Sequence, residues 1–402
     1  MSGDTKIPED FFGMVHAGIT GTEEEYTLLD EMGINWISYT FYWDRIENQK
    51  GQFDFSYYDR YVDTAKSRGK KVLAVLGYEA SWLYPPGKSK NYISAEDLPF
   101  FLNFAEQMVR HFQGRVDAWE IWNEPNLMFW AGRDEEFFDL TKQTARRIRE
   151  TDPEAYILGG AFWRVPKKFI NAMHKAGAME ILDGLAFHPY AASPRRVMKL
   201  HDDFLEILRD INFSGSVWIT ELGYPTAGWF PIRVSLEELP SHVIKTITGA
   251  AVRGTRVLMW YELLDSYNRD EVPSGTRNSE KFFGLTYPNY ERKNGAWAYE
   301  LCARNLSGAR YRKDLPMREN IPKSIVSFCF SGGAQGSNTL ILWNDKDSIL
   351  KVNVGFGAPA MLHDIASGES RPLPAEVVID VGKEPLFITW RGNENLKISV
   401  PR

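Results

Sequence analysis

Trp119-Glu120-Ile121-Trp122-Asn123-Glu124-Pro125-Asn126 is the stretch around which the rest of the sequence can be interpreted. Residues 116–122 are largely apolar and predict a buried strand, which Pro125 cannot continue. The strand therefore ends in the polar pair Asn123 and Glu124. At the mouth of a parallel barrel, side chains from several strand ends meet a substrate, so the pair is a candidate catalytic site. The alternative is that both residues order a loop or cap a helix.

Length and composition favour a large globular enzyme with an appendage. The chain has 402 residues, which suits a barrel of roughly 250–300 residues plus a smaller module. Aromatic residues make up 14% of it, including 13 Trp, which favours a surface that stacks on flat ligands. The net charge of -6 provides no broad basic field, so nucleic acid and anionic membranes are unsuitable partners and a neutral ligand is expected. Nothing in the sequence sets the oligomeric state.

Cysteine usage and the N-terminal residues bear on the compartment. Cys302 and Cys329 predict two buried free thiols, the alternative being a single bridge. The first ten residues are polar and lack the pattern of a signal peptide, and no run of about 18 apolar residues occurs. We therefore expect a cytoplasmic protein unless a signal segment has been removed, in which case it is secreted or periplasmic.

Short apolar runs alternate with amphipathic stretches over the first 300 residues, a pattern typical of repeated strand-helix units. Eight units over this length predict an α/β fold, a (β/α)8 TIM barrel spanning residues 1–308, whose last helix ends near Asn305. The predicted strands cover residues 11–17, 35–43, 71–78, 116–122, 156–162, 184–190, 217–224 and 256–263.

Beyond the barrel the pattern changes to short alternating runs separated by Gly, Asn, Asp and Pro. These runs predict a small C-terminal antiparallel β-sandwich in residues 309–402. Its expected strands cover residues 325–330, 339–343, 350–354, 377–381 and 386–390.

A second carboxylate stands at another strand end, in Val217-Trp218-Ile219-Thr220-Glu221-Leu222-Gly223-Tyr224-Pro225. Glu124 and Glu221, from the fourth and seventh barrel strands, would face each other across the mouth. Paired carboxylates in this arrangement cleave glycosidic bonds. A separation of roughly 5–5.5 Å would give retention of configuration, and roughly 6.5–9.5 Å would give inversion.

Several ordered motifs resemble those of clan A glycoside hydrolases. Besides the two glutamate motifs, they are Trp43-Asp44-Arg45-Ile46-Glu47, Phe187-His188-Pro189-Tyr190 and Trp260-Tyr261-Glu262. With the trailing β module, the sequence is most similar to glycoside hydrolase family thirty-nine. The resemblance implies a retaining double-displacement enzyme with Glu124 as acid/base, Glu221 as nucleophile and Asn123 holding the sugar 2-hydroxyl.

Electrostatics is consistent with this division of roles. An ionised Glu221 nearby would raise the pKa of Glu124 and keep a proton on it for the leaving oxygen. Once Glu221 is esterified by the sugar, its charge is gone, so the pKa of Glu124 falls and Glu124 can deprotonate water.

Other candidates are aromatic or polar residues at strand ends. His188 and Tyr190 lie at i and i+2 of one strand, so both can point into the mouth. Trp260 could form the floor beneath the sugar, with core packing as the alternative for all three. Loop aromatics at many mouths favour an open cleft and endo-action on a polysaccharide. The remaining predicted substrate-binding residues are His16, Trp43, Glu79, Trp82, Trp130 and Trp163.

Rival chemistries have little support in the motifs. The seven His are scattered without His-x-His or His-Glu-x-x-His spacing, so we predict no metal site and no cofactor. A Gly-x-Ser-x-Gly elbow is also missing from the sequence. The alternative function is a catalytically inactive carbohydrate-binding barrel. The sugar and its linkage stay open, because specificity depends on loop shape rather than on the glutamate pair.

Overall fold

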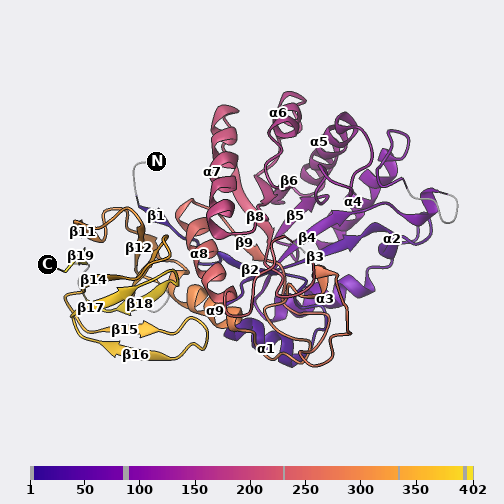
Figure 1. Ribbon diagram of the computed structural model, residues 1–402. Coiled ribbons are helices and arrows are strands. Elements are labelled where there is room, and N and C mark those ends of the chain that lie inside the picture. Colours follow the sequence, from indigo (N-terminus) through magenta and orange to yellow (C-terminus); the bar gives the residue numbers. More distant parts are fainter. Residues whose placement is uncertain (1–3, 85–89, 230, 334–335, 393–395, 402) are drawn as a thin grey trace.

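The barrel predicted from the sequence is present. The computed structural model of the protein describes residues 4–84, 90–229, 231–333, 336–392 and 396–401 (Figure 1). Eight parallel strands pair in chain order and close into a barrel, with β9 next to β2. The strands are β2 (Phe12–Val15), β3 (Trp36–Tyr42), β4 (Lys71–Gly77), β5 (Ala118–Ile121), β6 (Ile157–Trp163), β7 (Gly184–His188), β8 (Ser216–Leu222) and β9 (Leu258–Trp260).

The strands read as apolar runs because both faces are buried, one inside the barrel and one under the helices. Inside, the Trp36 and Trp218 rings meet edge to face at 5.0 Å and fill the lower barrel. A Cβ at Gly13 would come within 2.2 Å of Met259 Sδ, so only glycine fits beside this large side chain. The barrel interior is therefore a packed core at this level.

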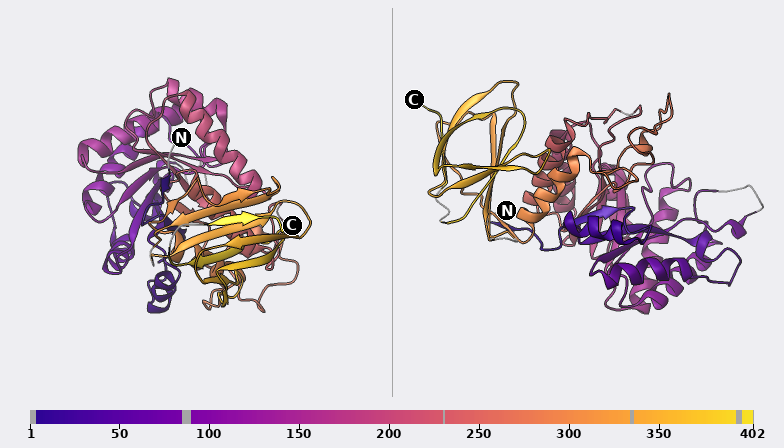
Figure 2. Two further views of the ribbon diagram at one scale, coloured as in Figure 1. Left: turned by 90° about the vertical axis from the view of Figure 1, so that its left-hand side faces the viewer. Right: turned by 90° about the horizontal axis from the view of Figure 1, so that it is seen from below.

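Helices surround the barrel, and two of them also contact the C-terminal part. Figure 2 shows this part lying to one side, against α8 and α9. The predicted last helix, ending near Asn305, is α9 and ends at Leu306. The helices are α1 (Glu23–Glu31), α2 (Trp43–Ile46), α3 (Ser56–Ser67), α4 (Leu98–Phe112), α5 (Asp134–Thr151), α6 (Lys167–Lys175), α7 (Pro194–Asp210), α8 (Leu239–Val252) and α9 (Asn294–Leu306).

The C-terminal part is built from two β-sheets around a second apolar core, as the sequence predicts. All five predicted strands are present. Five further strands escaped prediction because they have only two to four residues, and the residues of β11 are all exposed. The strands of this part are β10 (Arg310–Tyr311), β11 (Met317–Glu319), β12 (Ile325–Ser331), β13 (Asn338–Asn344), β14 (Leu350–Gly355), β15 (Ala360–His363), β16 (Ser370–Leu373), β17 (Glu376–Val381), β18 (Leu386–Trp390) and β19 (Lys397–Ser399).

The first strand of the chain belongs to this second part. β1 (Thr5–Lys6) pairs antiparallel with β10, with Thr5 opposite Tyr311, and forms the edge of the seven-stranded sheet. The sequence does not reveal this strand, because two residues carry no alternating pattern. The chain therefore begins in the C-terminal sheet before it enters the barrel at β2.

Side chains at the junction fix the two parts together. The Trp297 ring on α9 is covered by the Arg292 guanidinium at 4.3 Å, and a Cβ at Gly368 would lie 3.1 Å from the same ring. Gly368 has φ +75°, so a side chain there would also strain the backbone.

Cys302 and Cys329 are free and buried, as predicted. In the part of the chain that the structure describes, no helix is long and apolar enough to cross a membrane.

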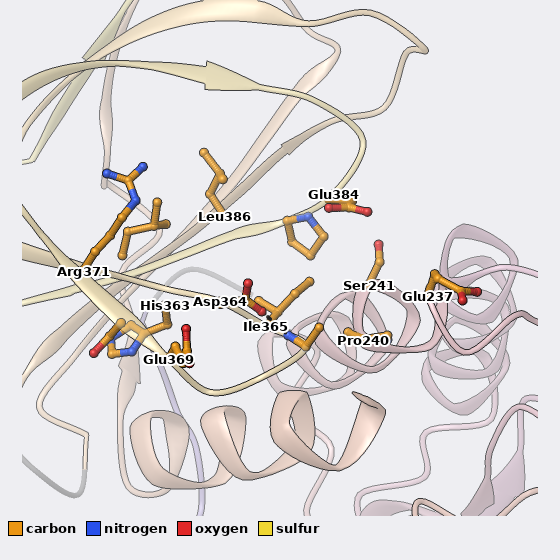
Figure 3. A pocket seen from close by; sticks show the side chains of 14 residues that line it. Glu237, Pro240, Ser241, His363, Asp364, Ile365, Glu369, Arg371, Glu384 and Leu386 are labelled. Atoms are coloured by element: carbon orange, nitrogen blue, oxygen red, sulfur yellow. Dashed lines mark hydrogen bonds between the residues drawn. The ribbon is translucent and has the colours of Figure 1, made fainter. Parts of the chain in front are cut away.

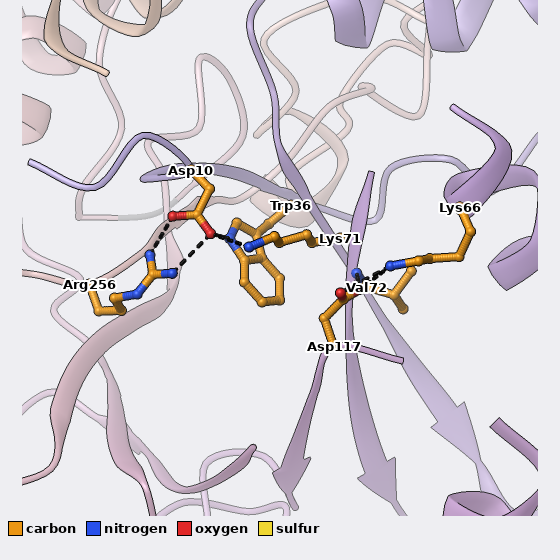
Figure 4. A network of polar contacts seen from close by, with 7 residues as sticks. All are labelled: Asp10, Trp36, Lys66, Lys71, Val72, Asp117 and Arg256. Atoms are coloured by element: carbon orange, nitrogen blue, oxygen red, sulfur yellow. Dashed lines mark hydrogen bonds and ion pairs between the residues drawn. The ribbon is translucent and has the colours of Figure 1, made fainter. Parts of the chain in front are cut away.

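An ion-pair network closes the end of the barrel opposite the mouth (Figure 4). Asp10, just before β2, accepts hydrogen bonds from both terminal nitrogens of Arg256 at 2.6 and 2.9 Å and from Lys71 Nζ at 2.6 Å. Burial alone would raise the pKa of Asp10, but the two cations outweigh it and hold this pKa well below its usual range. Asp10 thus joins the starts of β2, β4 and β9.

We expect Asp10→Asn to lower the free energy of unfolding at pH 7 by about 1–3 kcal/mol, because two cations lose their charged partner. A carboxylate whose pKa is depressed in the folded state stabilises the protein above its unfolded pKa. This stabilisation is lost as the pH falls through the folded pKa. The difference in the free energy of unfolding between the wild type and Asp10→Asn, measured by urea unfolding, should therefore shrink below about pH 4. Asp380→Asn, at an exposed ion pair with Lys351, is the control and should change stability by less than about 0.5 kcal/mol.

Candidate active site

The backbone after β5 turns sharply and places Glu124 over the barrel mouth. Trp122 has φ 67° and Glu124 has φ 42°, so both adopt the left-handed conformation that side chains disfavour. The Glu124 amide donates to the Ala161 carbonyl at 3.0 Å, which holds the turn against β6. Such backbone strain persists where surrounding contacts enforce it, as at catalytic sites.

Asn126 ties the next loop in place. Its Nδ2 donates to the Trp163 carbonyl and its Oδ1 accepts from the Trp163 amide, both at 3.0 Å. This pair of bonds joins the loops after β5 and β6. The motif Asn-Glu-Pro-Asn therefore includes a second Asn whose role is to hold the loop, which the sequence alone did not indicate.

Glu124, His188 and Glu221 converge at the mouth as a bonded triad. His188 Nδ1 lies 2.8 Å from Glu124 Oε1 and 3.0 Å from Glu221 Oε2. One atom from each of the three residues lies within 4.8 Å of the others. Three such groups could also hold a metal ion, but here His188 Nδ1 points at the two carboxylates themselves at hydrogen-bond distance. The sequence placed all three residues at the mouth without showing that His188 bridges the glutamates.

The environment gives the triad distinct protonation states. Burial raises the pKa of Glu124, the charge of Glu221 adds to this, and the hydrogen bond from His188 opposes it. Burial alone would lower the pKa of His188, but the charges of Glu221 and Glu124 and their hydrogen bonds raise this pKa to about 10. At neutral pH His188 is therefore an imidazolium, and the environment of Glu124 favours its protonated form.

Glu120 lies deeper in the barrel on the same side of β5. The sequence suggests a buried ion-pair partner for it, but its hydrogen-bond partner is the Thr220 hydroxyl, which donates to Glu120 Oε1 at 2.9 Å. The Thr220 oxygen also lies 3.1 Å from His188 Nε2. Burial raises the pKa of Glu120 to about 7, with His188 and Thr220 opposing the shift.

A cavity of about 200 Å³ opens above these groups. Asn123 lies in its wall, as predicted, and hydrogen-bonds Tyr78. Four Tyr residues that were not predicted also line it: Tyr39, Tyr42, Tyr78 and Tyr261. The complete lining is Val15, His16, Ser38, Tyr39, Thr40, Tyr42, Val75, Tyr78, Glu120, Asn123, Phe129, His188, Thr220, Glu221 and Tyr261.

His16, at the end of β2, lies in the wall as predicted. Its Nδ1 is 2.7 Å from Glu262 Oε2, and its ring packs edge to face against Tyr261 at 5.3 Å. Burial would lower the pKa of His16, but Glu262 outweighs it and raises this pKa. Of the two residues, His16 is the one in the described lining of the cavity.

Three predicted substrate-binding Trp residues lie in the core instead, so these predictions were wrong. Met259 and Tyr261 point into the barrel, so Trp260 between them points outward and packs against Tyr224 and Tyr299. Trp43 stacks on Phe104 of α4 at 5.5 Å, and Trp130 packs against Trp122 and Phe137. None of the three is more than 5% exposed.

The remaining predicted residues lie around the cavity rather than in its described lining. Tyr190 stacks on Trp163 at 5.1 Å, and its amide bonds back to the His188 carbonyl, so the strand pleat ends before it. Trp82 donates to the Glu47 carbonyl at 2.8 Å and links the loops after β3 and β4. Glu79 accepts a bond from the Lys90 amide at 3.3 Å.

A larger cavity lies at the junction of the two parts (Figure 3). Its volume is about 420 Å³, and it is lined by the start of α8, around Ser241, and by loops of the β-sheets. Glu237, Asp364, Glu369 and Glu384 face it together with Arg371. None of the predicted site residues lines this cavity, which lies between α8 and the C-terminal β-sheets.

Comparisons with known proteins agree with this fold. A family model described as Cellulase (glycosyl hydrolase family 5) matches residues 4–224, more than half of the chain. Endo-1,4-beta-xylanase A from Phanerodontia chrysosporium is 31% identical over 121 residues, covering 28% of this chain and 29% of the relative. A beta-xylosidase from Caldicellulosiruptor saccharolyticus is 31% identical over 130 residues, covering 28% and 27%. The chain thus spans less than a third of either relative's length.

Solved structures share the whole architecture. A family 39 glycoside hydrolase from Bacteroides cellulosilyticus WH2 superposes with a TM-score of 0.77 at 21% identity, covering 96% of this chain and 81% of that one. A family 30 endoxylanase from Clostridium papyrosolvens C71 gives 0.66 at 13% identity, covering 99% and 98%. The likeness to family thirty-nine expected from the motifs is therefore found in the fold. The chain belongs to the Cellulase family (glycosyl hydrolase family 5) of clan A glycoside hydrolases.

Proposed function

We propose that the protein is a retaining β-glycosidase that cleaves β-linked glycosidic bonds by double displacement. One observation carries this proposal: a carboxylate oxygen of Glu124 and one of Glu221 lie within 4.8 Å of each other. Retaining enzymes hold their carboxyl groups roughly 5–5.5 Å apart, whereas inverting enzymes need roughly 6.5–9.5 Å to admit a water. The short separation favours direct attack by one carboxylate on the sugar.

In the proposed mechanism Glu221 is the nucleophile and Glu124 the acid/base. Glu221 lies on the cavity wall, with Oε2 3.0 Å from His188 Nδ1. Its oxygen bonds to the anomeric carbon while the bond to the leaving oxygen breaks and Glu124 donates its proton. Glu124 then takes a proton from water, which attacks the same carbon and releases Glu221.

The cavity wall supports roles for several predicted binding residues. Asn123 reaches the cavity next to the acid/base and would hold the sugar 2-hydroxyl, a contact that strengthens in the transition state. His16 with Glu262 would bind a second hydroxyl from the opposite wall. Trp163 and Tyr190 would support the catalytic loops from outside the cavity.

The lining favours one neutral sugar ring. Among its described residues there is no Lys or Arg to pair with the carboxylate of an acidic sugar. A volume of about 200 Å³ is below the roughly 300–1,000 Å³ of sites for larger ligands. With Trp43, Trp130 and Trp260 buried, the mouth offers fewer stacking surfaces than the sequence suggested. We therefore propose removal of single sugars from a chain end rather than endo-action.

We further propose that residues 1–308 form the catalytic domain and residues 309–402 an accessory domain that stiffens the barrel through α8 and α9. The Trp297 contacts support a packing role for the accessory domain. The alternative of an inactive carbohydrate-binding barrel is less favoured, because the glutamate pair and its bridging His188 are intact.

The stereochemical test uses NMR of the products during the first minutes of hydrolysis. A panel of β-linked aryl glycosides of neutral and uronic sugars should yield turnover with a neutral sugar. The first anomer released should be β, because two inversions restore the configuration. An α anomer appearing first would contradict the mechanism. A polysaccharide of the preferred sugar should release mainly monosaccharide, and a ladder of oligosaccharides would contradict chain-end action.

A further inference from the structure

Glu120 and Thr220 have no part in the bond-making steps above, yet both are buried directly behind the triad. Glu120 is 2% exposed and Thr220 is 4% exposed. They link to His188 through the Thr220 hydroxyl, which lies 2.9 Å from Glu120 Oε1 and 3.1 Å from His188 Nε2. A buried carboxylate is costly unless its hydrogen bonds are made, so this arrangement needs an explanation.

The direction of each hydrogen bond between Glu120, Thr220 and His188 is fixed by the protons that these side chains carry. Thr220 donates its one hydroxyl proton to Glu120 Oε1. The Thr220 oxygen can then only accept from His188, which requires a proton on Nε2. On the other side of the ring, Nδ1 faces Glu124 and Glu221 and must also carry a proton to bond the ionised Glu221.

We propose that Glu120 and Thr220 are positioning residues that keep the proton on His188 Nε2 and so hold His188 as a fixed imidazolium between the two catalytic glutamates. We call the pair the Thr220 relay. This inference rests on the proposed roles of Glu124 and Glu221, because its purpose is to orient them. The relay contacts His188 rather than the reacting carbon.

The relay has a consequence for each catalytic step. The one proton on Nδ1 is shared between Oε2 of Glu221 and Oε1 of Glu124, so we expect the acid proton of Glu124 on Oε2, the oxygen left to meet the leaving group. Before attack, the negative charge of Glu221 balances the positive charge of the imidazolium. After attack, Glu221 is a neutral ester, and the negative charge of Glu124 balances the imidazolium instead. The proton on Nε2 stays with Thr220 throughout, so the ring need not turn or exchange protons between steps.

Few other groups face His188 in the described structure. Glu124 and Glu221 face Nδ1, Glu120 lies behind Thr220, and the Tyr190 ring meets the imidazole edge to face at 6.5 Å. Burial raises the pKa of Tyr190 well above its usual range, so its hydroxyl is neutral during turnover. A change in His188 titration after substitution of Thr220 can therefore be assigned to the relay.

The direct test is nitrogen NMR of the full chain labelled with ¹⁵N-histidine. The His188 signals are assigned by their loss in His188→Asn. Both ring nitrogens of the wild type should be protonated at pH 7 and titrate only in the alkaline range. Thr220→Val keeps the shape of the side chain and removes the hydroxyl. It should lower the midpoint of the His188 titration by about one to two pH units, the effect of losing a hydrogen bond to a charged group. Thr220→Ser, the matched control, should leave the midpoint in place.

Activity provides the second readout. Thr220→Val should lower kcat about 10- to 100-fold with little change in KM, and its activity should fail at a lower pH on the alkaline side. Glu120→Gln keeps a hydrogen-bond acceptor and removes the charge, so it should also lower the midpoint of the His188 titration. This variant replaces Thr220→Val in the test if Thr220→Val fails to fold. A wild-type His188 protonated on Nδ1 alone, or equal titration in the Val and Ser variants, would overturn the relay. Because NMR needs no turnover, a wild type that hydrolyses no glycoside would contradict the proposed function and leave this test intact.

Discussion

Glu221→Ala is expected to abolish turnover of a competent β-glycoside, with kcat falling roughly 10⁴- to 10⁶-fold, the range seen when a nucleophile is removed. The proposed mechanism makes its first bond to Glu221, and a methyl group cannot replace it. Glu221 is partly exposed on the cavity wall and packs little, so the fold should be kept. Steady-state kinetics together with circular dichroism and a melting curve check both statements.

Azide sharpens this test because it can enter the space that the carboxylate leaves. It would attack the anomeric carbon from the same side as Glu221, form a carbon–nitrogen bond as the leaving group departs, and give an α-glycosyl azide. Glu376→Ala, an exposed glutamate of the C-terminal part, is the control and should keep full activity. Full activity in Glu221→Ala itself would refute the assignment of the nucleophile.

Glu124→Ala should give the second largest effect, and its size should depend on the leaving group. A sugar or alkoxide leaving group needs the proton from Glu124, so we expect a loss of about 10²- to 10⁴-fold in kcat/KM. A nitrophenolate leaves without protonation, so its first step should be nearly unchanged and a burst of phenolate should precede slow hydrolysis of the glycosyl-enzyme. Stopped-flow and steady-state assays on a series of aryl and alkyl glycosides measure both.

Azide gives the opposite stereochemistry in this variant. It would attack the glycosyl-enzyme from the face that Glu124 occupied, form the carbon–nitrogen bond as Glu221 departs, and yield a β-glycosyl azide. The two variants therefore assign the two roles independently. An α product from Glu124→Ala, or equal losses for all leaving groups, would contradict its role as the acid/base.

The barrel and its glutamate pair were predictable because each polar strand end interrupts an apolar run. Glu124 follows β5 and Glu221 lies near the end of β8, so parallel pairing places both at one edge of the barrel. The bridging position of His188 was not predictable, since it depends on distances of 2.8 and 3.0 Å that spacing does not encode. Only the fold shows that the Thr220 hydroxyl lies within hydrogen-bond distance of Glu120.

The misplaced Trp residues show the limit set by strand phase. A shift of one residue in the expected pleat exchanges inward and outward side chains, and at β9 this exchanges Trp260 with Tyr261. Trp43 and Trp130 lie beyond the ends of their strands, where the chain has already turned. The alternation of inward and outward side chains along a strand therefore no longer predicts where they point. The direction of an aromatic residue just past a strand end is set by the packing of neighbouring helices, such as α4 under Trp43.

The pairing of β1 with β10 has a consequence for how the chain folds during synthesis. Thr5 is synthesised before its partner Tyr311, which follows 306 residues later. At roughly 5–20 residues per second, this interval is about 15–60 s. The barrel strands between them can form their contacts during this time, while β1 has no partner strand. This edge of the sheet can therefore close only after the chain has been synthesised as far as β10.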